Sequence, residues 1–281
     1  MFAARLPLPP LLSLLRSFSS ALRLSSSSPP ISAAPPSPFP WLRSASAADV
    51  SALRALLPGR GEVLSPCAGD DLSGYNTDWL RAHVGSSAAV LRPSSLAGVR
   101  AALAYCHAQR LGVVPQGGNT GLVGGGVPIG AEVILSLSRL RSIISFDALS
   151  GVLVAEAGAV LGELDAALAP RGWAMPLDLG AKGSCQIGGN VATNAGGIRL
   201  LRYGSLHGSV LGLEAVAADG SLLDCLSTLR KDNVGFDLKQ LFVGSEGALG
   251  VVTRVALLAA PPLRPPPPPR TPTRCTTRRR T

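Results

Sequence analysis

The stretch Pro115–Gly126 constrains the fold more than any other part of the sequence. Six of its twelve residues are glycine and none is charged. Glycine adopts positive φ angles without strain, and successive backbone N–H groups in such a loop can form a concave site for an anion. A short apolar run at 111–114 precedes the stretch and predicts a strand. We therefore expect a loop at a strand end that binds a diphosphate group, with a flexible surface loop as the plainer alternative.

The spacing of these glycines excludes two common phosphate-binding motifs. No Lys-Ser or Lys-Thr pair follows them, so the stretch is not a P-loop. Gly118, Gly121 and Gly124 are three residues apart, so the dinucleotide pattern G-x-G-x-x-G is missing. No helical pattern begins directly after the glycines. The sequence still accommodates a nucleotide cofactor that is held in another way.

Two further glycine-rich regions follow. Residues 183–197 contain the pairs Gly188-Gly189 and Gly196-Gly197, with two asparagines and a threonine between them. Small residues allow close packing on a flat ring, and amide and hydroxyl groups offer neutral donors and acceptors, which suits an isoalloxazine; a tightly packed Gly/Ala helix is the alternative. The third region, 243–250, contains Glu246, either an acceptor for a neighbouring turn or an ordinary charged loop residue. Repeated regions of this kind favour a large, flat, phosphate-bearing cofactor.

Basic residues are concentrated at the two ends of the chain, whose formal net charge is +9. Residues 1–48 contain four arginines and residues 264–281 contain six, without an acidic residue in either segment. The 16 basic and 17 acidic residues of 49–263 leave that part at −1. Because a nucleic-acid-binding face needs clustered lysine and arginine, we expect no nucleic-acid partner.

Both terminal segments are expected to be disordered extensions outside the fold. Residues 1–48 are rich in arginine and serine and lack acids, which is typical of an organelle transit peptide. We expect a presequence for the mitochondrial matrix, with a plastid address, a secretory signal and an inert leader as alternatives. The Pro/Arg-rich residues 261–281 cannot form a core. We expect a sequence read out of frame there, with a linker or a polyproline ligand as alternatives.

The cysteines and histidines predict neither disulfides nor a metal site. The five cysteines are odd in number and none are closely spaced, so the sequence indicates no disulfide framework and no zinc knuckle. His83, His107 and His207 are far apart, and none has a partner at helical spacing. We expect a reducing compartment and no bound metal.

Hydrophobic periodicity predicts an α+β chain without a membrane-spanning segment. A helix capped by Ser94 or Ser95 carries apolar residues at spacings of three and four over 96–106, and Asp219-Gly220 predicts a hairpin. The other expected elements are helices at 50–57 and 160–168, strands at 88–91, 113–114, 132–137, 142–146, 151–156, 209–217, 221–226 and 251–258, and a helical turn at 238–242. This order predicts two lobes, with the glycine loop where they meet.

The glycine regions together resemble a known cofactor domain. From 65 to 259 the chain is similar to the FAD-binding domain of the vanillyl-alcohol oxidase/p-cresol methylhydroxylase (PCMH) type. The most specific matches are Pro115–Gly126, the run from Leu177 to Gly208, and Gly244–Gly250. Within that family, Cys185-Gln186 and the end of the second run favour the dehydrogenases of D-2-hydroxyglutarate.

This resemblance implies a two-lobed α+β domain at 85–260 with FAD between the lobes, preceded by a helical and connecting segment at 49–84. It implies that the backbone N–H groups of Gly117–Gly121 bind the diphosphate. In full, it assigns cofactor binding to Pro115, Gln116, Gly117, Gly118, Asn119, Thr120, Gly121, Gly125, Ser184, Gly188, Gly189, Asn190, Thr193, Asn194, Gly196, Gly197, Gly250, Val251 and Val252. Some relatives attach the flavin through a loop histidine; this loop has none, which implies non-covalent FAD.

The resemblance further implies oxidation of D-2-hydroxyglutarate to 2-oxoglutarate by hydride transfer to flavin N5. Electrons would pass to an acceptor such as electron-transfer flavoprotein. The substrate-binding and metal-binding residues of the family belong to a C-terminal domain expected after Ala259, so we expect a truncated form that is inactive alone and whose catalytic residues lie elsewhere. Alternatives are a dehydrogenase of another D-2-hydroxy acid such as D-lactate or glycolate, a non-catalytic flavin- or partner-binding fragment, and a proline-rich interaction protein.

Overall fold

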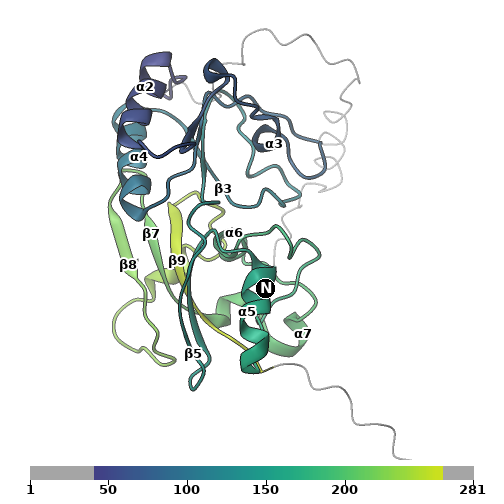
Figure 1. The fold of residues 1–281 in the computed structure, drawn as a ribbon. Helices are drawn as coiled ribbons and strands as arrows, with labels where there is room; N and C mark the ends of the chain where they lie inside the picture. Colours follow the sequence, from purple (N-terminus) through teal and green to yellow (C-terminus); the bar gives the residue numbers. More distant parts are fainter. Residues whose placement is uncertain (1–40, 262–281) are drawn as a thin grey trace, which may run out of the picture. The chain divides into compact units, whose positions relative to one another are not determined.

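The computed structural model describes residues 41–261, which form two β-sheets with short helices around them (Figure 1). The first sheet has the strand order β1-β2-β4-β3. Its strands are β1 (Val63–Leu64), β2 (Val90–Leu91), β3 (Val113–Gln116) and β4 (Val133–Ser136). Strands β2, β4 and β3 are parallel, and β1 is antiparallel at the edge. The strands predicted in this part of the chain are confirmed.

The glycine stretch connects β3 to its parallel neighbour β4. Because Val113 pairs with Val133, the chain has to return from the carboxyl end of β3 to the start of β4. It does so through residues 117–132, which contain no helix or strand. Connections of this length without secondary structure are uncommon in compact domains and are usually functional.

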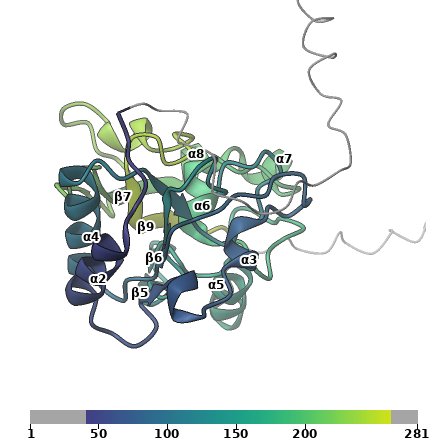
Figure 2. The same ribbon diagram turned by 90° about the horizontal axis from the view of Figure 1, so that it is seen from above.

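Helix α4 (Leu96–Ala108) completes a β2-α4-β3 unit. The Ser95 side chain accepts a hydrogen bond from the backbone N–H of Gly98 at 3.1 Å, so the predicted N-cap is confirmed at this serine. Val99 and Cys106 are buried on the predicted apolar face. Burial raises the pKa of the Cys106 thiol to about 12. Helix α2 (Ala47–Leu56) packs against α4 (Figure 2).

The second sheet has the order β5-β6-β9-β7-β8 and is antiparallel. Its strands are β5 (Ile143–Asp147), β6 (Val152–Glu156), β7 (Val210–Val216), β8 (Leu222–Cys225) and β9 (Val251–Leu258). The hairpin predicted at Asp219-Gly220 joins β7 to β8, and Gly220 has a φ of 84°. Arg100 of α4 donates a hydrogen bond from Nε to the Gly220 carbonyl at 3.1 Å, which links α4 to this turn.

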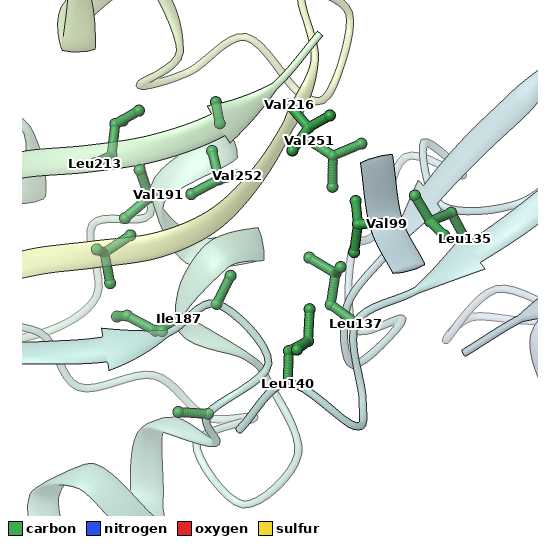
Figure 3. Close-up of a cluster of buried hydrophobic side chains, with 14 of the residues drawn as sticks. Val99, Leu135, Leu137, Leu140, Ile187, Val191, Leu213, Val216, Val251 and Val252 are labelled. Atoms are coloured by element: carbon green, nitrogen blue, oxygen red, sulfur yellow. The ribbon is translucent and has the colours of Figure 1, made fainter. Parts of the chain in front are cut away.

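One continuous core joins the two sheets. In Figure 3, side chains from α4 and β4 lie opposite side chains from α6 (Ile187–Ala192), β7 and β9. Leu135 of β4, Ile187 of α6 and Leu213 of β7 are almost completely buried within this single cluster. The two sheets therefore share this main core, and only a small second cluster, Leu72, Val90 and Ile134, packs apart from it.

The remaining elements are short and lie mostly in connections. They are η1 (Pro66–Ala68), α3 (Ser73–Asn76), α5 (Leu161–Leu168), η2 (Ala169–Arg171), α7 (Leu200–Tyr203), α8 (Leu206–Ser209) and η3 (Leu238–Leu241). The predictions at α5 and η3 are confirmed. The helical turn α3 was not predicted, because a single turn carries too few residues to show a period.

The described chain begins with a segment that contacts the first sheet. Arg43 forms an isolated parallel bridge with Leu111, just before β3. Its guanidinium group donates hydrogen bonds to both carboxylate oxygens of Asp49, at 2.6 and 2.7 Å. These bonds hold the pKa of the buried Asp49 well below its usual range, and Ser46 caps α2. Residues 41–48, which the sequence assigned to the leader, thus lie against the domain.

The other predictions for the chain ends, at 1–40 and 262–281, lie outside the described residues. Within 41–261, no helix is both long and apolar enough to cross a membrane.

Candidate cofactor site

A cavity of about 830 Å³ lies where the three glycine-rich regions meet. Its wall consists of the end of β3 with the following loop, the segment 179–195 around α6, and residues 246–252 at the start of β9. Cavities of roughly 300–1,000 Å³ are typical of small-molecule and cofactor sites. The fold therefore brings the three regions selected from the sequence to one site.

Most of the predicted cofactor-binding residues line this cavity. They are Pro115, Gln116, Gly117, Gly118, Asn119, Thr120, Gly121, Gly125, Ser184, Gly188, Gly189, Asn190, Thr193, Gly250, Val251 and Val252. Asn194, Gly196 and Gly197 are not part of the lining. Asn194 accepts hydrogen bonds at Oδ1 from the His207 backbone N–H and the Ser205 hydroxyl, both at 3.1 Å. Gly197 has a φ of 77° and no room for a Cβ against a neighbouring backbone carbonyl, so its role is to set the chain path.

The backbone N–H groups of Gly117–Gly121 belong to a run, reaching to Gly126, that has no hydrogen-bond acceptor among the residues that the structure describes. These residues are half-buried or exposed, and Gly117–Gly121 line the cavity, so their N–H groups are free to bond a ligand. Asn119 adopts a left-handed backbone with a φ of 51°, the type of conformation in which successive N–H groups converge on an anion. This part of the cavity wall therefore has the properties of a diphosphate cradle.

The side-chain amides of the loop hold its shape. Gln116 donates from Nε2 to the carbonyl oxygens of Gly126 and Tyr75, both at 2.8 Å. Asn119 donates from Nδ2 to the Thr77 carbonyl at 2.8 Å. Both residues were predicted to bind cofactor, and the structure shows their amide donors bonded within the protein. These side chains fix the loop against the segment before it, while both residues also line the cavity.

Two glycines let the cavity walls approach each other closely. A Cβ on Gly118 would overlap the carbonyl oxygen of Ser184, so the loop touches the segment before α6. A Cβ on Gly188 would lie 2.5 Å from the Cβ of Ala157, so α6 rests on the end of β6. The neighbouring Gly189 has nothing within 4 Å of an added Cβ and borders the open cavity.

Two buried acceptors of the wall have no partner among the described residues, namely Oε1 of Gln186 and Oδ1 of Asn190. An unpaired buried acceptor costs roughly 1–3 kcal/mol, so a ligand that donates hydrogen bonds there gains affinity. Leu137, Leu179 and Val252 add an apolar surface to the same wall. This combination fits FAD, which has an aromatic ring system with an N–H donor, hydroxyl groups and a diphosphate.

The cavity has no cationic side chain among its described lining residues, so an anion is bound there by backbone groups. Burial raises the pKa of the Cys185 thiol, although a hydrogen bond with Asn190 acts in the opposite direction. This lining thiol is therefore protonated at neutral pH. Between residues 41 and 261, no cluster of three histidine, cysteine, aspartate or glutamate side chains could hold a metal ion.

Sequence reasoning missed several residues of the wall, above all Gln186, Trp79 and Glu246. Gln186 stood inside a quoted motif, but its motif position did not indicate that its side chain is buried beside the loop. Trp79 comes from a segment whose contact with the loop depends on Asn119 and its bond to Thr77. A charged residue inside a glycine cluster was the available signal for Glu246.

The fold and the cavity define a domain that binds FAD, and comparison with known proteins agrees. Residues 87–226 match the family model described as FAD binding domain. A solved structure of alkyldihydroxyacetonephosphate synthase shares the fold, with a TM-score of 0.67 and 18% identity over 88% of this chain and 48% of that one. The chain belongs to the family of FAD-binding domains, and its cofactor is FAD. The predicted α+β fold class is confirmed.

Within this family the chain is similar to D-2-hydroxyglutarate dehydrogenases. It is 58% identical to the mitochondrial D-2-hydroxyglutarate dehydrogenase of Danio rerio, over 81% of this chain and 42% of that protein. The corresponding protein of Arabidopsis thaliana is 55% identical over 80% of this chain and 40% of its own length. A putative mitochondrial D-lactate dehydrogenase of Schizosaccharomyces pombe is 52% identical over 73% of this chain and 38% of its own length. The chain thus spans about two fifths of the curated relatives that it matches.

Proposed function

We propose that this chain provides the FAD-binding part of an oxidoreductase that converts D-2-hydroxyglutarate to 2-oxoglutarate. The observation that carries the proposal is the run of unpaired N–H groups at Gly117–Gly121, on the wall of a cavity with the size and polarity of a flavin site. The similarity to proteins named D-2-hydroxyglutarate dehydrogenase supports the choice of substrate.

Each part of the wall has a distinct role in this proposal. The loop Gly117–Gly121 holds the diphosphate through its backbone, and Gln186 and Asn190 accept hydrogen bonds from donors of the cofactor. Val251 and Val252 exclude water from the apolar side. When bound, FAD supplies a two-electron acceptor for the hydride of the substrate α-carbon. Asn194, Gly196 and Gly197 are outside the cavity lining, so this proposal gives them no contact with the cofactor.

The cofactor is proposed to be held without a covalent bond. The described lining residues include no histidine, and the lining thiol, Cys185, is buried and protonated. Flavin that is bound in this way leaves the protein when acid unfolds it.

The substrate, the electron acceptor and the location are proposed from the relatives. D-2-hydroxyglutarate has two carboxylates, which arginine or lysine side chains bind best, and the described cavity wall offers neither. We therefore assign recognition of the substrate to parts of the longer relatives beyond the matched two fifths. We propose electron-transfer flavoprotein as the electron acceptor. We propose the mitochondrial matrix as the location, since the relatives are named mitochondrial.

The experiment is a visible spectrum of the purified, desalted chain, followed by addition of substrate. We expect a two-banded flavin spectrum whose chromophore is released by acid. Bleaching by D-2-hydroxyglutarate, and not by its L-enantiomer, supports the reaction. A folded protein that takes up no added FAD contradicts the proposal.

A second candidate follows from the described cavity wall, which offers no arginine or lysine to the substrate carboxylates: a flavin-binding domain without turnover. Flavin that binds but is not bleached by D-2-hydroxyglutarate, D-lactate or glycolate favours this candidate. Faster bleaching by D-lactate than by D-2-hydroxyglutarate would instead identify D-lactate as the substrate, in line with the similarity to the fission yeast protein.

A further inference from the structure

One part of the cavity wall has no regular secondary structure. Residues 175–185 contain no helix or strand. The same segment nevertheless contributes several residues to the lining, namely Leu179, Gly180, Ala181, Gly183, Ser184 and Cys185. Because its buried backbone groups lack the hydrogen bonds of a helix or sheet, they need other partners.

The side chain of Arg199, directly before α7, is such a partner. Its Nη1 donates to the Met175 carbonyl oxygen at 2.7 Å and to Oδ1 of Asp165, on α5, at 3.1 Å. The same carboxylate oxygen accepts a hydrogen bond from the Met175 backbone N–H at 2.8 Å. Both backbone polar groups of the fully buried Met175 are thus bonded to one ion pair.

Arg199 and the two residues before it also contact Asp178. Nη2 of Arg199 lies 3.7 Å from Oδ2 of Asp178. The Ile198 backbone N–H donates to the Asp178 carbonyl oxygen at 3.2 Å, and a Cβ on Gly197 would overlap that same oxygen. These three residues therefore fix the wall segment at Asp178 as well as at Met175, immediately before the part that lines the cavity.

The ion pair between Arg199 and Asp165 is charged at neutral pH. Burial raises the pKa of Asp165, but the hydrogen bonds from Arg199 and Met175 outweigh burial and lower this pKa overall. Lys182 lies 3.3 Å from the Asp178 carboxylate, but its side chain is 53% exposed. Only 17% of the Arg199 side chain is exposed, and a planar guanidinium group bonds several acceptors in a fixed geometry, which an ammonium group does not.

We propose that Arg199 is a positioning residue for the FAD site, an inference that rests on the proposed function. Arg199 is not part of the cavity lining, so it acts through Met175 and Asp178 on the wall that begins at Leu179. A wall that is fixed before the ligand arrives needs less ordering on binding, and affinity rises accordingly. Arg199 thereby strengthens the binding of FAD without touching it.

The test is Arg199→Met in the full chain, a variant that removes the charge and the donors. FAD affinity, measured by flavin fluorescence, should fall about tenfold or more. The visible circular dichroism of the bound flavin, recorded at saturating FAD, should change because the wall beside it moves. A loss of stability alone would lower the melting temperature, but it would leave the affinity of the folded chain unchanged.

Two further variants make the test specific. Arg199→Lys keeps the charge without the fork of donors, and its FAD affinity should lie between those of wild type and Arg199→Met. Arg43→Met breaks an ion pair with Asp49, and neither of these residues lines the cavity. It removes the same charge and should lower the melting temperature while leaving the affinity and the flavin spectrum as in wild type.

The inference is overturned if Arg199→Met binds FAD as tightly as wild type with an unchanged flavin spectrum, or if Arg43→Met weakens FAD binding equally. If Arg199→Met does not fold, Arg199→Lys decides: weaker binding supports the proposal and unchanged binding refutes it. These outcomes concern Arg199 alone. Wild-type chain that binds no FAD refutes the proposed function and this inference with it.

Discussion

At a few residues, single atoms or a single ion pair determine the local structure. Gly118 and Gly197 have no room for a Cβ because a backbone carbonyl occupies its place. Asn119 and Glu246 both have left-handed backbones at the wall. At Asp49, remote from the cavity, a buried carboxylate depends on the guanidinium group of Arg43.

Gly118→Ala should weaken FAD binding at least about tenfold, because the added methyl forces the loop away from Ser184 and overpacking costs about 1–3 kcal/mol. Flavin fluorescence titration and a thermal melt measure the two effects. Gly208→Ala is the matched control, since its Cβ has nothing within 4 Å and the residue lies outside the cavity lining. Equal affinity of Gly118→Ala and wild type would contradict the close contact between loop and wall.

Asp49→Asn should lower the free energy of unfolding at pH 7 by about 1–3 kcal/mol, through loss of the charged hydrogen bonds to Arg43. The folded-state pKa of Asp49 is lowered, so its stabilisation is present above the unfolded pKa of about 3.9. The stabilisation is lost as the pH falls towards the folded pKa. Denaturant unfolding should therefore show the two proteins converging below about pH 4. A difference that does not depend on pH would exclude the ion pair as its source.

At the scale of elements, α6 links the second sheet to the cavity, because its position depends on β6 and in turn determines part of the cavity wall. Its N-terminal half rests on the end of β6 through Gly188, while Gly189 and Asn190 line the cavity. The Glu246 backbone is bonded to its C-terminal end. A shift of this short helix therefore moves several parts of the wall together.

Gly188→Ala should lower both the melting temperature and the FAD affinity, because its Cβ would lie 2.5 Å from that of Ala157. Ala157→Gly alone should be mildly destabilising, by about 1 kcal/mol. The double variant should recover part of both losses, since the closest atom is then removed while the Ala157 carbonyl oxygen, at 3.0 Å, remains. Thermal melts and FAD titration of all four proteins give the coupling energy. Additive losses in the double variant would show that the two positions do not share this contact.

Sequence patterns predicted the long elements well, because the hydrophobic periodicity of a helix or strand is carried by residues that are near one another in the sequence. Strand β9 was expected at 251–258 and lies there, and α4 begins after its predicted cap. Two short elements, β1 and α7, were missed because two to four residues show no period, and β1 exists only through its pairing with β2. The same limit applies to the site. Glycine clustering identified the wall, whereas the inward position of Gln186 depends on how α6 packs.

At the scale of the whole molecule, the main core of the described chain is shared by both sheets, while a smaller cluster, Leu72, Val90 and Ile134, lies apart from it. Leu135 of the first sheet and Leu213 of the second lie in one cluster of buried side chains (Figure 3). Since the cavity lies between elements of both sheets, its shape depends on the integrity of this core. Unfolding of either sheet should therefore open the cavity.

Leu135→Ala should destabilise the whole described region by about 2–5 kcal/mol, as expected for a fully buried leucine. Far-ultraviolet circular dichroism and the release of bound flavin should then shift to lower temperature together. Ile144→Ala, at an exposed position of β5, is the control and should shift neither. Separate transitions for the two probes would indicate that the sheets unfold independently.

The central place of β9 in the second sheet has a consequence for biosynthesis. This strand is the last of the described elements to leave the ribosome, yet it lies between β6 and β7. Until it emerges, the hairpins β5–β6 and β7–β8 each present an unpaired inner edge, the kind of edge that binds other chains. A growing polypeptide of this fold is thus most exposed to mispairing and to chaperone capture just before β9 is synthesised.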